Sequence, residues 1–85
     1  MYDYKKEKPN LFTEDGQVIF LAIRDRVNRL IAEAGCVRMD AAIAKQSGDA
    51  WTMLACVDRL VELREIVEVT RGNCAGQFRI FTRHE

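Results

Sequence analysis

The chain has 85 residues, of which 48% are hydrophobic and 31% charged, and its 13 basic residues are balanced by 13 acidic ones. This balance predicts one small globular domain rather than a disordered chain. A formal net charge of zero excludes DNA binding driven by overall basicity, so any DNA affinity has to come from a local patch. The chain has neither an apolar run long enough to cross a membrane nor the apolar core of a signal peptide, which predicts a cytoplasmic protein without membrane contact.

Residues that could bind a metal or take part in catalysis are few and widely spaced in the sequence. Cys36, Cys56 and Cys74 do not have the paired spacing of a zinc or iron–sulfur site, so we expect unpaired thiols in a reducing compartment. The only histidine, His84, is next to the last residue, and no glycine-rich phosphate loop is present. We therefore expect a non-enzymatic domain that uses no cofactor, no metal and no small-molecule substrate.

The first elements in chain order are an arm and a long helix. Residues 1–12 are rich in lysine and show no apolar periodicity, which predicts a flexible N-terminal arm ahead of a domain spanning residues 13–85. From Thr13 to Ala34, apolar residues recur at helical spacing. Thr13 can cap this helix, and Gly35 suits its left-handed end.

A second and a third helix are expected after a short strand stub at residues 36–39. Asp40 is a candidate N-cap for a helix from Ala41 to Gln46, and Asp49 for one that continues to about Arg64. Because only a short turn containing glycine separates them, the two predict a helix-turn-helix arrangement.

The remainder of the chain has the pattern of a β-hairpin. After Glu65 the apolar period changes from 3.6 to 2, and residues 66–71 are rich in β-branched side chains. Residues 77–83 alternate in the same way, and residues 72–76 between them begin and end with glycine. Two such runs joined by five residues predict two strands and a turn.

This order resembles that of bacterial winged-helix repressors. Residues 40–48 are similar to their second helix, and residues 53–66 to their recognition helix and its exit into the wing. The resemblance implies an α+β fold, namely a three-helix winged helix-turn-helix with a C-terminal two-stranded β-hairpin wing. One departure is Arg64, which stands where such proteins often have glycine, so either Arg64 takes a glycine-like bend or the bend differs.

The resemblance also implies double-stranded DNA as a partner and the function of a small transcriptional regulator or accessory factor. The third helix would enter the major groove, while arginines of the wing and cations near the second helix would hold phosphates. A homodimer would add the specificity that one small module lacks, and either the long first helix or the patch at Trp51 and Leu54 would supply its contact. The DNA-binding candidates are Arg38, Lys45, Trp51, Thr52, Ala55, Arg71, Arg79 and Arg83.

A protein-protein interaction module on the same frame, without DNA binding, is the alternative. The side of the third helix expected to be exposed carries apolar residues, and Asp58 on that side would repel phosphate. Exposed apolar patches are typical of contacts with protein. The candidates for such a contact, in a homodimer or with another protein, are Phe12, Phe20, Trp51 and Leu54.

Overall fold

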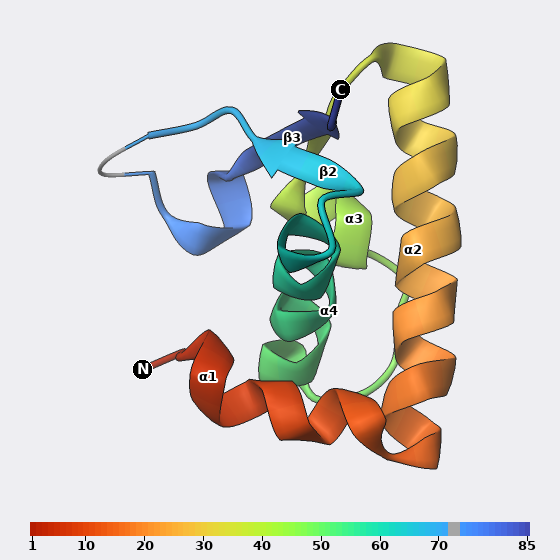
Figure 1. Ribbon diagram of the computed structural model, residues 1–85, viewed down its shortest axis with the longest axis vertical. Helices are drawn as coiled ribbons and strands as arrows, with labels where there is room; N and C mark the ends of the chain where they lie inside the picture. The colour runs from red at the N-terminus through yellow and green to blue at the C-terminus, as the bar shows by residue number, and fades with distance from the viewer. Residues whose placement is uncertain (72–73) are drawn as a thin grey trace.

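A computed structural model describes residues 1–71 and 74–85 as an α+β fold, in which helices pack around one core and against a small antiparallel sheet (Figure 1). The long α2 runs along one side, α4 lies at the centre, and the sheet closes one end. The elements are α1 (Tyr4–Glu7), the 3₁₀ helix η1 (Lys8–Phe12), α2 (Glu14–Ala34), β1 (Val37–Arg38), α3 (Met39–Ile43), α4 (Ala50–Glu62), β2 (Ile66–Glu68), the 3₁₀ helix η2 (Gly76–Phe78) and β3 (Ile80–Arg83).

The predicted ends of α2 are confirmed. The hydroxyl of Thr13 accepts a hydrogen bond from the backbone N–H of Gly16 at 3.0 Å, which satisfies a donor of the first turn. Gly35 ends the helix in the left-handed region, with φ at 83°. Phe20, Ile23, Val27 and Ile31 form the inward stripe of this helix, close to the predicted one.

The N-terminal segment differs from the flexible arm that we expected. Residues 4–12 are helical, and the segment crosses one end of α4 to reach the start of α2 (Figure 1). Leu11 is only 1% exposed and belongs to the core. A Cβ at Gly16 would collide with the backbone carbonyl of Asn10, so glycine is what allows η1 to approach α2 this closely.

The two helices of the predicted helix-turn-helix are present, but the first is displaced. α3 starts at Met39, two residues before the predicted Ala41, and the Met39 N–H donates to the carbonyl of Arg79 at 2.7 Å, which ties the start of the helix to the hairpin. Asp40 therefore lies in the first turn and not at the N-cap. The cap of α4 is confirmed, since the Asp49 carboxylate accepts from the Thr52 N–H at 3.0 Å.

The predicted two-stranded hairpin is part of a three-stranded antiparallel sheet with the order β1-β3-β2. The stub at Val37–Arg38 supplies the third strand and pairs with Phe81 and Ile80 of β3. The strands are shorter than predicted, and Gly76–Phe78 forms a 3₁₀ turn, so β3 begins only at Ile80. Of the predicted turn at 72–76, residues 72 and 73 lie outside the described residues.

The exit from α4 is made by Arg64 in a glycine-like conformation. Its φ is 61°, in the left-handed region that side chains rarely occupy. The bend expected from a glycine at this position is therefore present, and Arg64 adopts it despite its Cβ. This bend directs the chain from the end of α4 into β2, whose first residue, Ile66, is buried.

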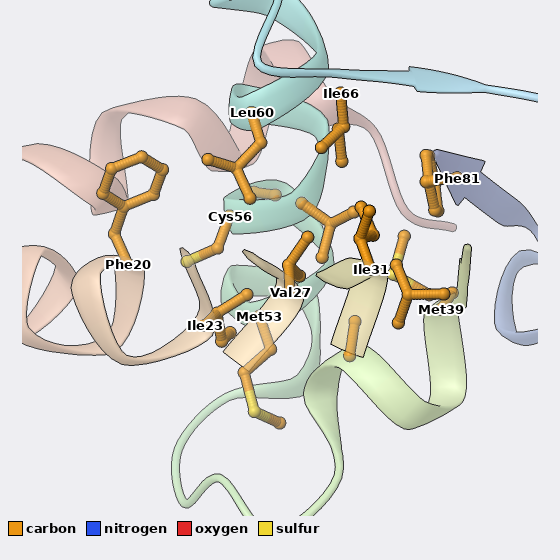
Figure 2. Packing of buried hydrophobic residues seen from close by; sticks show 14 of the residues in the cluster. Phe20, Ile23, Val27, Ile31, Met39, Met53, Cys56, Leu60, Ile66 and Phe81 are labelled. Carbon is orange, nitrogen blue, oxygen red and sulfur yellow. The ribbon is translucent and has the colours of Figure 1, made fainter. Parts of the chain in front are cut away.

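The core lies between α2, α4, α3 and the inner face of the sheet, as Figure 2 shows. Phe81 of β3 and Met39 of α3 close it at the sheet end, while Phe20 packs near α4 at the other. All three cysteines are free, as predicted. Cys56 is fully buried within α4, and burial raises the pKa of its thiol to about 12, which keeps it protonated and unreactive.

Candidate interaction surfaces

Fewer residues lie on the exposed outer face of α4 than the sequence predicts. Thr52 and Ala55 were expected on the exposed side, but both are buried, and the Thr52 hydroxyl is bonded to Asp49 at 3.2 Å. The reason is that η1 and α1 cover a flank of α4 that we expected to be open. The expectation that both side chains are exposed is therefore wrong, and their burial argues against a contact of either one with bases. The residues left on the outer face are Trp51, Leu54, Asp58, Val61 and Glu62.

Arg79 was predicted to hold a phosphate, but the structure places it in an acidic cluster. Its guanidinium bonds to Asp58 of α4 at 2.8 Å and to Glu68 of β2 at 2.8 Å, and it stacks over the ring of Phe81. Burial alone would lower its pKa, but the hydrogen bonds to Glu68 and Asp58 raise it, so the charge is retained. With two carboxylates already bound, Arg79 joins the hairpin to α4, which argues against its predicted role as a DNA contact.

Two tyrosines attach the N-terminal segment to the same side of α4. The Tyr2 hydroxyl donates to Asp58 at 2.6 Å, and the Tyr4 hydroxyl donates to Glu62 at 2.7 Å. Burial, followed by the hydrogen bonds to these carboxylates, raises the pKa of both phenols. The segment therefore covers part of the face that the sequence assigned to DNA.

Glu62 is held by three donors, one each from α1, η1 and α4 itself. Besides Tyr4, it accepts from Arg59 at 2.6 Å and pairs with Lys8 at 3.0 Å. The hydrogen bonds from Tyr4, Lys8 and Arg59 lower the pKa of Glu62 to about 2. This carboxylate is therefore ionised at neutral pH and acts as the acceptor that fixes α1 and η1 to the end of α4.

The other predicted cations are exposed. Arg83 lies opposite Ile66 at the start of β2, whereas Arg71 lies three residues beyond the end of that strand. Lys45 is exposed in the turn between α3 and α4. Arg38 is paired with Asp40 at 2.7 Å and lies over the ring of Phe78. Of the predicted cations, Arg38 and Arg79 are thus held by carboxylates of the chain itself.

The apolar candidates divide into two groups. Trp51 is 43% exposed on the outer face of α4, and Leu54, one turn further on, is half-buried. Phe12 is 58% exposed, whereas Phe20 is buried in the core, because it falls on the inward stripe of α2. Phe20 is therefore wrong as a residue of an exposed interface.

A second apolar surface is formed by exposed side chains of η1, α2 and the end of α4, and of its members the sequence analysis named only Phe12. We call it the α2 face, and its members are Phe12, Val18, Leu21 and Leu63. A hollow of about 350 Å³ lies between Phe12 and Leu63, with Phe20 at its wall. The sequence signal was that Val18 and Leu21 are apolar but lie off the inward stripe of their helix.

Within residues 1–71 and 74–85, no three potential ligand side chains come together as a metal site, and no helix is long and apolar enough to cross a membrane. His84 is exposed. Comparisons with known protein families, curated proteins and solved structures found no match. The inference about a partner therefore rests on the surfaces of the chain itself.

Proposed function

We propose that this chain is a winged-helix domain that binds another protein through the outer face of α4. The order of elements from α2 to β3 supports the winged-helix assignment, together with a sheet in which β3 lies between β1 and β2. The short turn between α3 and α4 and the hairpin after α4 supply the helix-turn-helix and the wing of that arrangement.

The observation that carries the choice of a protein partner is the chemistry of the outer face of α4. A helix that reads bases presents Arg, Lys, Asn, Gln or Ser to their edges. Here the exposed surface is given by Trp51 with Leu54 beside it, and the polar residues further along, Asp58 and Glu62, are acids. A half-exposed tryptophan next to a leucine is typical of the anchor of a protein interface.

The neighbourhood of this face also favours protein over DNA. Arg79, which would have supplied positive charge from the wing, is neutralised by Asp58 and Glu68. The donors that reach Asp58 and Glu62 leave this side of α4 close to neutral. A phosphate backbone approaching here would gain little from counterion release, whereas an apolar partner surface would desolvate few uncompensated charges.

Position-specific crosslinking tests the proposal. A photoreactive residue at position 51 should crosslink a discrete protein in cells of the native host, while the same residue at Val67, which is 40% exposed on β2, should not. Trp51→Glu should abolish capture of that protein, and Trp51→Phe should retain it, because an aromatic anchor fits the same pocket. Crosslinking to nucleic acid instead, or capture unaffected by Trp51→Glu, would contradict the proposal.

Duplex DNA is the second candidate partner, in the role of a small transcriptional regulator. Lys45 and Arg71 favour it, since both are exposed and neither forms an ion pair among the described residues. Contacts from these two side chains would reach phosphates and not base edges. The two candidates therefore differ in the salt dependence of binding to random-sequence duplex.

A further inference from the structure

We propose that residues 1–7 form a displaceable strap, which closes over the outer face of α4 and which the protein partner has to displace in order to bind. The partner's part in this rests on the proposed function, whereas the opening of the strap does not. Tyr2 and Tyr4 make the contacts of the strap with α4, through hydroxyls that donate to Asp58 and Glu62. A partner that binds along this helix therefore competes with the strap for the same two carboxylates.

The strap lies on the stripe of α4 to which Trp51 belongs. Positions 51, 55, 58 and 62 follow one another at spacings of three or four residues, so they share one face of the helix. Trp51 is exposed, but Ala55 is fully buried, and the two acids that follow are bonded to the tyrosines. Only about 10 Å of helix separates Trp51 from Asp58 at 1.5 Å per residue. An interface of about 1,000 Å² therefore needs the covered part of this stripe as well.

The attachment of the strap allows it to open while the core stays folded. α1 contributes no buried residue, and Leu11, beyond the strap, is the first core residue in chain order. The backbone N–H groups of Lys6 and Glu7 donate to Asp3, inside the strap, and among the described residues no backbone hydrogen bond joins residues 1–7 to α4. A helix of only four residues does not persist without packing. The strap therefore detaches by local unfolding, with Leu11 still in the core.

The strap also indicates the chemistry of the partner. When it leaves, Asp58 loses the hydroxyl of Tyr2 and Glu62 loses that of Tyr4. Asp58 is only 14% exposed, so a partner that covers it without a donor would leave an acceptor site unfilled. We therefore expect the partner to bring hydroxyl or ammonium donors to these acids, next to an apolar surface that receives Trp51.

Amide hydrogen exchange of the full chain at a fixed pH tests the opening without a partner. The strap amides, those of Lys6 and Glu7, should exchange through local opening, with protection factors at least about tenfold below that of Val57 at the centre of α4. Their protection should not depend on low concentrations of urea, whereas that of Val57 should. No protection of the strap amides, or protection equal to that of Val57 with the same urea dependence, would overturn the proposal.

Removal of the two hydroxyls tests what closes the strap. The double variant Tyr2→Phe/Tyr4→Phe should lower the protection of the strap amides by about tenfold or more, because both hydrogen bonds to carboxylates are lost. Thr70→Val is the matched control, since it removes a hydroxyl that donates to Glu68 at 2.7 Å on the hairpin. It should leave the strap amides unchanged. Equal protection of these amides in the double variant and the wild type would show that the tyrosine hydroxyls do not hold the strap.

Crosslinking at position 51 separates this proposal from the proposed function. With a benzophenone side chain at that position as the probe, the double variant should give several-fold more of the crosslinked protein than the wild type, because its open state is more populated. Thr70→Val should give the wild-type yield. A crosslink of equal yield in all three chains would overturn the strap's control of binding and leave the proposed function standing. No crosslinked protein in any of them would overturn the proposed function, and with it the partner's part here, whereas the exchange result would still decide whether the strap opens.

Discussion

The N-terminal segment and the C-terminal hairpin both pack on α4, and each behaves in the opposite way to what its composition suggests. The segment is polar and rich in lysine, yet it is helical and buries Leu11. The hairpin is rich in arginine, yet its central arginine, Arg79, forms ion pairs with two carboxylates of the same chain. Side-chain type therefore does not tell whether a charge is available to a partner, because that depends on which acids the fold brings beside it.

The largest effect is expected at the contact between the N-terminal segment and α2. Gly16→Ala would push a methyl group into the Asn10 carbonyl, so η1 would have to move away, and we expect about 3 kcal/mol of lost stability. Gly76→Ala is the matched control, since nothing lies within 4 Å of a Cβ there. Urea denaturation measures both. Equal stability of the two variants would mean that the segment is as loosely held as its composition implies.

The next effect concerns the hairpin. Arg79→Ala would leave Asp58 and Glu68 without their shared cation, and these side chains are only 14% and 30% exposed. We expect a loss of about 2 kcal/mol, in the range for hydrogen bonds to charged groups. Arg83→Ala, at the exposed base of the hairpin, should change the stability by less than about 0.5 kcal/mol. If the two variants unfold alike in thermal denaturation, Arg79 is not the structural residue that we describe.

Acid should loosen the N-terminal segment. The pKa of Glu62 is lowered from 4.5 to about 2 in the fold, so its contribution is fully present above pH 4.5 and is lost as the pH falls toward 2. The protection factors of the α1 amides, which compare their exchange rates with the intrinsic rate at each pH, should therefore fall across this window. Glu62→Gln should exchange faster at neutral pH and show a flatter acid dependence. An acid response identical to that of the wild type would assign the effect to other carboxylates, such as Glu68.

The smallest effect, and the only expected gain in stability, concerns the bend between the end of α4 and the start of β2. Arg64 occupies the left-handed region with φ at 61°, so Arg64→Gly should stabilise the protein by about 0.5–1 kcal/mol. The matched control is Arg71→Gly, in the exposed segment after β2. Arg24→Gly is less suitable, because Arg24 lies inside a helix. A lower melting temperature for Arg64→Gly than for Arg71→Gly would contradict the strain at this bend.

Local patterns predict much of this fold and little of its surface. Thr13, Gly35 and Asp49 define helix ends through their own short-range bonds, so the sequence identifies them. The burial of Thr52 and Ala55 depends on a segment more than forty residues earlier in the chain. The pairing of Arg79 with Asp58 likewise joins distant elements, and no periodicity encodes it. The α2 face was detectable, since Val18 and Leu21 depart from the inward stripe, but we did not give these positions weight.

Binding to random-sequence duplex DNA at about 50 mM and about 200 mM salt tests most directly the claim that α4 meets protein and does not read DNA. With Arg38 and Arg79 both paired with carboxylates, we predict dissociation constants weaker than about 100 µM at both concentrations and a shallow dependence on salt. Micromolar binding at low salt that falls steeply at high salt, and that Arg71→Ala or Lys45→Ala weakens, would contradict the account and favour the DNA-binding regulator.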